Sequence, residues 1–143
     1  MKALPAWAWF ALGSAFFAGL TAFFGKLGVA AVNADVATFI RTLVILAVTA
    51  AVVSLRREWV PASTIPLSSW TSLVLSGAAA GASWLCYYRA LQAGPLAKVA
   101  PVDKLSIVFA ILLGAVVLGE PLTLPVAIGG LLITAGAIVM IFG

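Results

Sequence analysis

The sequence predicts an all-α integral membrane protein, with five transmembrane helices in a single domain spanning residues 1–143. The first observation is composition: 64% of the residues are hydrophobic and only 8% are charged, whereas a soluble domain usually carries about 25% charged residues. The second is that the apolar residues form runs of about 18 to 22, the length that crosses a bilayer as a helix. We therefore expect a lipid bilayer to surround the chain.

The first two helices are expected over residues 5–24 and 36–55. Trp7 and Trp9, near the start of the first run, are typical of an aromatic anchor at the membrane interface. Arg41 falls within the first turns of the second helix, where a charged side chain is unusual. A short loop connects the two helices.

The remaining three helices are expected over residues 70–91, 99–118 and 124–142. Gly94 and Pro95 break the chain between the first and second of these. Pro101 is expected in the first turn of the fourth helix, where its missing N–H costs little. Gly119 and Pro121 end that helix.

Glycines mark the faces on which we expect helices to pack closely. Gly77 and Gly81 form a GxxxG pair in the third helix, and Gly129, Gly130 and Gly136 give the fifth helix a small-residue side. Such faces let two backbones approach within a membrane. The alternative is chance, because glycine and alanine are abundant in this chain.

An odd number of spans places the two termini on opposite sides of the membrane. We call the side opposite the N-terminus the far face, and there connectivity places the basic residues Lys26, Arg41, Arg89, Lys98 and Lys104. The near face holds Lys2, Arg56 and Arg57. Without Arg41 and Lys104, which lie within spans, the two faces carry equal numbers of basic residues, so the Lys/Arg bias permits insertion both ways. The far-face excess favours an anionic or zwitterionic solute.

Several polar and aromatic residues within or beside the spans are candidates for a substrate pathway. They are Arg41, Trp84, Tyr87, Tyr88, Asp103, Lys104 and Ser106. A charged residue near the bilayer centre costs about 2.5 to 3.5 kcal/mol on insertion scales, so such residues usually mark a pathway or find partners.

Each candidate also has a purely structural interpretation. Arg41 and Lys104 either line a cavity or extend to the headgroups. Asp103 either forms a buried salt bridge, with Arg41 as a possible partner, or couples to protons or substrate. Helix geometry turns Asp103 and Lys104 about 100° apart, so they need not pair with each other.

The aromatic residues also allow two interpretations. Trp84, Tyr87 and Tyr88 form either a wall against an organic solute or an interfacial belt. Beyond them, Arg89, Gln92 and Lys98 are expected to be solvated at the far face, and Glu120 is expected to be a loop and capping residue.

Composition also limits the chemistry. The chain has no histidine and one cysteine, so we expect no metal site, and the GxxxxGK[ST] motif of nucleotide binding is absent. We expect no cofactor and no enzymatic activity. The basic residues are scattered, which argues against a nucleic-acid surface.

A series of short motifs resembles the EamA domain of the drug/metabolite transporter superfamily. The matching segments are Tyr88-Arg89-Ala90-Leu91-Gln92-Ala93-Gly94, Val99-Ala100-Pro101, Leu118-Gly119-Glu120, and Gly129-Gly130-Leu131-Leu132-Ile133 with Gly136. The resemblance covers essentially the whole chain. It implies one half of a ten-helix inverted-repeat transporter fold, because typical members carry two five-helix halves and this chain is similar to the short members.

The resemblance implies a membrane transporter that moves small organic solutes, such as metabolites or amino-acid-like or drug-like compounds, across the cell membrane. We expect alternating access and a second copy: a homodimer, antiparallel where the charges permit, or a related half-transporter. A bacterial or archaeal inner membrane is the expected location. The alternative is a small membrane partner or assembly subunit that transports nothing.

Overall fold

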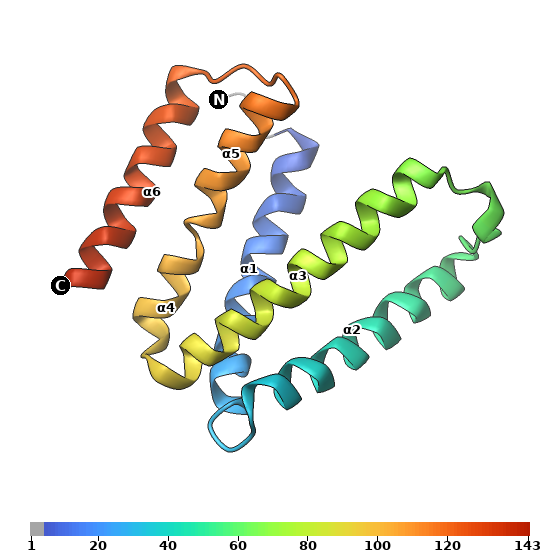
Figure 1. The fold of residues 1–143 in the computed structure, drawn as a ribbon, viewed down its shortest axis with the longest axis horizontal. Helices are drawn as coiled ribbons and strands as arrows, with labels where there is room; N and C mark the ends of the chain where they lie inside the picture. Colours follow the sequence, from blue (N-terminus) through green and yellow to red (C-terminus); the bar gives the residue numbers. More distant parts are fainter. Residues whose placement is uncertain (1–4) are drawn as a thin grey trace. The chain divides into compact units, whose positions relative to one another are not determined.

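The structure, a computed structural model, describes residues 5–143; Lys2, assigned above to the near face, lies outside them. Every regular element in these residues is helical (Figure 1). The elements are α1 (Ala6–Gly28), α2 (Ala34–Arg56), the 3₁₀ turn η1 (Ala62–Thr64), α3 (Leu67–Ala93), α4 (Leu96–Asp103), α5 (Ser106–Val117) and α6 (Leu124–Phe142). The prediction of an all-α chain is confirmed.

Four segments of the described chain are long and apolar enough to cross a membrane: α1, α2, α4 continued by α5, and α6. The expected third span, α3, is 27 residues long but is not among these four. Its first half carries the hydroxyl side chains of Ser68, Ser69, Thr71, Ser72 and Ser76, which lower its mean hydropathy. The structure therefore supports four of the five predicted spans, and the crossing by α3 stays a prediction.

Helix α2 has defined caps at both ends. The Asn33 side-chain oxygen accepts a hydrogen bond from the Asp35 backbone N–H at 2.8 Å, as a helix N-cap residue does. At the other end Arg57 adopts a left-handed conformation with φ of 56°. Its N–H donates to the Ser54 carbonyl, and the next N–H donates to the Val53 carbonyl. These bonds satisfy carbonyls at the helix end.

The predicted fourth helix is broken into α4 and α5. Pro101 lies well inside α4 and not in its first turn, so that prediction was wrong, because the helix begins at Leu96 and not at 99. A proline inside a helix removes a hydrogen bond and clashes with the preceding turn. The helix ends at Asp103, and the N–H groups of Lys104 and Leu105 form tighter bonds, to carbonyls three residues back.

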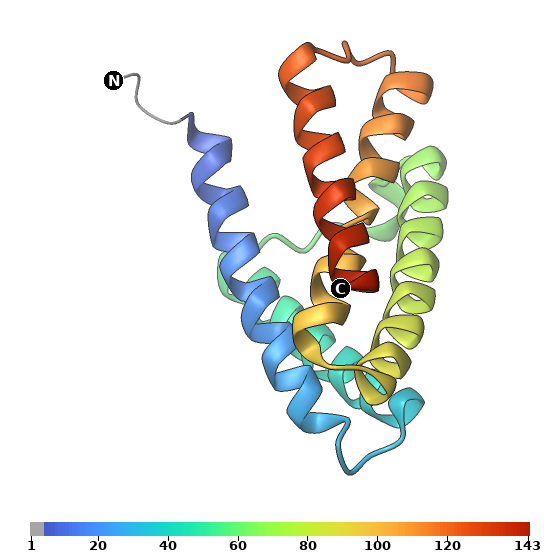
Figure 2. The same cartoon turned by 90° about the vertical axis from the view of Figure 1, so that its left-hand side faces the viewer.

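By its internal contacts the chain divides into two units. Unit 1 consists of Met1–Phe23 with Ala93–Gly143, and unit 2 of Phe24–Gln92. In unit 1, α6 packs against both α4 and α5 (Figure 2). Gly130 of α6 faces Ile111 of α5, and a Cβ there would lie 3.6 Å from the Ile111 Cδ1 atom, an ordinary contact distance.

The turn after α5 is built on glycine. Gly119 has φ of +68°, and the N–H groups of Leu118 and Glu120 both donate to the Gly114 carbonyl, at 3.2 and 3.0 Å. The Glu120 carboxylate folds back over Gly114, where a Cβ would lie 2.8 Å from its Oε2 atom. Glu120 thus occupies the loop and capping position that the sequence predicts.

The other glycines proposed for close packing have open space beside them. At Gly77, Gly81, Gly129 and Gly136, an added Cβ would have no other side chain or neighbouring backbone within 4 Å in the described chain. Gly130 alone of the predicted set contacts another helix within these residues. Close packing at the four open positions therefore stays a prediction.

Unit 2 has its buried core where the end of α1, the start of α2 and the end of α3 meet. Its buried residues include Val29, Ala34, Thr38, Tyr88 and Leu91. Leu91 is completely buried. This small core positions the polar and aromatic residues of the candidate site.

Candidate functional site

The loop between α1 and α2 is fastened to the end of α3 by side-chain hydrogen bonds within unit 2. The Gln92 amide donates to the carbonyls of Val29 and Val32, at 3.1 and 2.9 Å. The Lys26 ammonium donates to the Leu91 carbonyl. Gln92 is exposed, as the sequence predicts, and its amide also binds the loop carbonyls.

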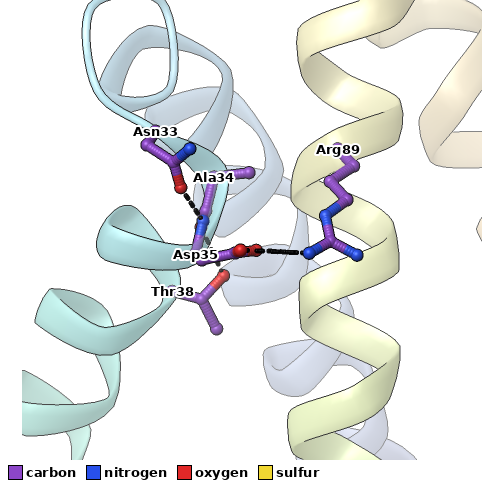
Figure 3. Close-up of polar contacts among 5 residues, drawn as sticks. All are labelled: Asn33, Ala34, Asp35, Thr38 and Arg89. Carbon is purple, nitrogen blue, oxygen red and sulfur yellow. Dashed lines mark hydrogen bonds and ion pairs between the residues drawn. The ribbon is translucent and has the colours of Figure 1, made fainter.

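An ion pair joins the start of α2 to α3 in the same unit. One Arg89 nitrogen, Nη2, donates to both carboxylate oxygens of Asp35, at 2.9 and 3.0 Å (Figure 3). The two side chains remain 61% and 51% exposed, so the pair itself contributes little to stability. Arg89 is thus partly solvated, as the sequence predicts, and it also has a fixed acidic partner.

Arg41 lies against the aromatic residues of α3. Its guanidinium stacks over the Trp84 ring and lies 5.7 Å from the centre of the Tyr88 ring. Trp84 and Tyr88 are four residues apart and so share one face of α3; their ring centres are 6.4 Å apart. Stacking of a cation on an aromatic face is favourable by about 0.5 to 2 kcal/mol, with the larger values where water is excluded.

Tyr88 is held from both sides. Its ring lies beside Tyr87, with centres 6.4 Å apart, and against Gly25 of α1, where an added Cβ would lie 3.1 Å from its Cε1 atom. Only 4% of Tyr88 is exposed. The ring is therefore a fixed support beneath the cation–aromatic stack.

The remaining candidates lie in unit 1, at the break between α4 and α5. The Lys104 ammonium pairs with the Asp103 carboxylate at 3.3 Å, and Ser106 begins α5. The sequence left open whether these neighbours pair, and the structure pairs them where α4 ends at Asp103. The structure pairs Asp103 with Lys104, and it pairs Arg41 with aromatic rings.

Sequence reasoning missed Asp35 and Gln92 as parts of the cluster in unit 2. A signal for Asp35 was present: connectivity places Asp35 and Arg89 on the same face of the membrane with opposite charges. Gln92 carried no comparable signal, because its partners are backbone carbonyls. Within the described residues, no group of three or more His, Cys, Asp or Glu side chains lies close enough together to hold a metal ion. The cluster offers charge, hydrogen-bond donors and aromatic faces.

Comparison with known proteins identifies the family. The model of the EamA-like transporter family matches residues 5–142. The chain belongs to the EamA-like transporter family. A relative from Sinorhizobium sp, described as an uncharacterized transporter in the cobO 3' region, is 52% identical over 134 residues, which cover 94% of this chain and 95% of the relative. No solved structure matches the chain.

The family assignment and the four apolar segments together establish a multi-pass membrane protein of a transporter family. In this EamA-like chain, the first of the matching segments, which begins at Tyr88, also forms part of the cluster of unit 2. Tyr88 supports the stack, Arg89 binds Asp35, Leu91 is buried and Gln92 fastens the loop. The Leu118-Gly119-Glu120 motif forms the turn after α5.

Proposed function

We propose that this EamA-like protein moves small organic solutes, of metabolite, amino-acid-like or drug-like type, across the cell membrane by alternating access. The observation that carries the proposal is the grouping of Arg41 with Trp84, Tyr87 and Tyr88, which joins one charged group to apolar ring faces. Sites for small organic molecules typically combine apolar and aromatic walls with a few placed polar groups.

The break between α4 and α5 supports a second part of the pathway, around Asp103, Lys104 and Ser106. Transporters often form substrate and ion sites where a transmembrane helix is discontinuous. In the apolar segment Leu96–Val117, an acid ends α4 and a base follows it at the break. We assign these residues to the pathway as part of the proposal.

The working unit that we propose is a dimer whose two copies insert in opposite orientations, so that one copy supplies each of two inverted repeats. The equal basic counts outside the spans support insertion both ways. The open glycines of α6, Gly129 and Gly136, provide a face for the second copy. A related half-transporter would fill the same place. We expect the inner membrane of a bacterium or archaeon, in agreement with the source of the relative.

Solute counterflow in vesicles containing only this protein tests the transport function. Vesicles preloaded with unlabelled solute should take up more labelled solute than matched vesicles without protein. Trp84→Ala should reduce that uptake. Absence of flux for every solute tried would favour the alternative of a non-transporting membrane partner.

Labelling of tags at the two termini, from outside intact cells, tests the dimer geometry. Each terminus should be reachable in part of the population. One uniform orientation for all molecules would remove the antiparallel arrangement and leave the transport function in place.

A further inference from the structure

Within unit 2, Arg41 has no acidic or carbonyl partner, unlike Lys26 and Arg89 of the same unit. Arg89 binds Asp35, Lys104 binds Asp103 and Lys26 donates to the Leu91 carbonyl. The described interactions of Arg41 are with the aromatic rings of α3 alone. Asp35, the acid nearest to it on α2, is already bound to Arg89.

The geometry of the stack leaves the hydrogen-bond donors of Arg41 accessible. A guanidinium carries five N–H donors, and the contact of its central carbon with the Trp84 ring uses none of them as a hydrogen bond. Within the described chain, none of these donors forms a hydrogen bond. Every side-chain nitrogen or oxygen that is fully buried there does have a hydrogen-bond partner, so the Arg41 nitrogens are not among the fully buried atoms. The nitrogen atoms of Arg41 can therefore be reached from outside the protein.

An accessible but unpaired cation on an apolar helix is costly, because the membrane does not solvate its charge. Arg41 is the eighth residue of α2, about 10 Å along the helix at a rise of 1.5 Å per residue. An anion at its free edge would remove that cost. Guanidinium groups bind carboxylates with two parallel hydrogen bonds, which fixes orientation as well as charge.

We infer that Arg41 is the recognition group for the carboxylate of a small organic anion, with Trp84 holding the guanidinium and Tyr87 contacting the apolar body, while the buried Tyr88 supports both rings from beneath. This inference rests on the proposed transport function and narrows its solute class. The adjacent rings favour an organic carboxylate over an inorganic anion, because an inorganic anion has no apolar surface to place against them.

Three nearly isosteric probes test the inference: benzoate, benzamide and benzamidinium, which are anionic, neutral and cationic. Binding to the purified full chain in phosphatidylcholine vesicles is measured through the rise in thermal stability. Benzoate should stabilise the wild type more than the other two probes at equal concentration. Arg41→Gln should weaken benzoate binding about ten-fold or more, since a lost charged hydrogen bond has at least that effect.

Two further variants complete the series. Arg41→Lys keeps the charge but loses the planar guanidinium, so benzoate binding should fall several-fold. This variant tests the inference independently if Arg41→Gln does not fold. Arg56→Gln is the matched control, because it removes an arginine from the other end of the same helix and should leave benzoate binding unchanged.

The phosphate of an anionic lipid is the other source of negative charge for Arg41. A second set of vesicles, containing phosphatidylglycerol, separates the two sources. The solute assignment would be overturned by two results together: phosphatidylglycerol stabilises the wild type but not Arg41→Gln, and benzoate has no effect in either membrane. Equal benzoate binding by wild type and Arg41→Gln, or a preference for benzamidinium, would overturn it as well.

Flux measurements keep this inference separate from the proposed function. Uptake of benzamidinium without uptake of benzoate would leave transport standing and remove the anion site. Arg41-dependent binding of benzoate without flux of any solute would keep the anion site and remove transport.

Discussion

Gly25 lies directly against the ring of Tyr88, so that a Cβ at this position would approach the Cε1 atom to 3.1 Å and the hydroxyl oxygen to 3.4 Å. The contact joins α1 to the aromatic face of α3 within unit 2. It also sets the position of the ring that lies 5.7 Å from the Arg41 guanidinium.

Gly25→Ala should therefore destabilise the protein by about 1 kcal/mol. Overpacking a tight contact costs about 1 to 3 kcal/mol, and the higher helix propensity of alanine offsets up to about 1 kcal/mol of that cost. Thermal unfolding in detergent measures the difference. Gly28→Ala, in the same helix but with open space beside it, is the control, and equal stability of the two variants would contradict the packing argument.

Gln92→Leu should destabilise unit 2 more than a typical surface substitution does. The change removes the amide donor from the carbonyls of Val29, in a part-buried bond, and Val32, in an exposed one; at Val29 an unsatisfied buried group costs about 1 to 3 kcal/mol. Hydrogen exchange of the loop after α1 should rise at the same time. Unchanged exchange there would show that the amide does not hold the loop.

The Asp35–Arg89 pair should contribute less than about 1 kcal/mol, because both side chains are more than half exposed. A double-mutant cycle with Asp35→Asn and Arg89→Gln measures the coupling. It should shrink as salt is raised, since ions screen exposed charges. A coupling of several kcal/mol that is insensitive to salt would mean that the pair is buried in the membrane-embedded protein.

Gly119→Ala and Gly114→Ala should act differently on the turn after α5. Gly119 has φ of +68°, so alanine there should cost about 1 kcal/mol of stability. At Gly114 the obstructing atom is the flexible end of Glu120, so alanine should displace the carboxylate with little loss of stability. Comparison of the two melting temperatures checks this order, and the reverse order would refute it.

Pro101→Ala should extend regular helix through the break between α4 and α5. The substitution restores a backbone N–H and removes the clash with the preceding turn. Spin labels placed on α4 and α5 should then report a longer and narrower distance distribution. The same distances in both proteins would show that other residues of the break, and not the proline, interrupt the helix.

Some features were determined by the amino-acid sequence alone. So few charges and such long apolar runs allow only helices in lipid, because every backbone polar group in a bilayer must be satisfied within its own segment. The break at Gly94 and Pro95, and the turn at Gly119, follow from local backbone chemistry. The helix ends at Asn33 and Arg57 are equally local, although the sequence alone located them only approximately.

Tertiary structure decided which of the polar residues meet. Arg89 and Asp35 are 54 residues apart in the chain, and Gln92 and Val32 are 60 apart; no local pattern relates them. The Arg41 guanidinium likewise lies over the ring of Trp84 on another helix, whereas a pair between Asp103 and Arg41 stays a prediction. The reason is physical: periodicity shows which residues share a face of one helix, whereas the packing of helices distant in sequence determines what that face contacts.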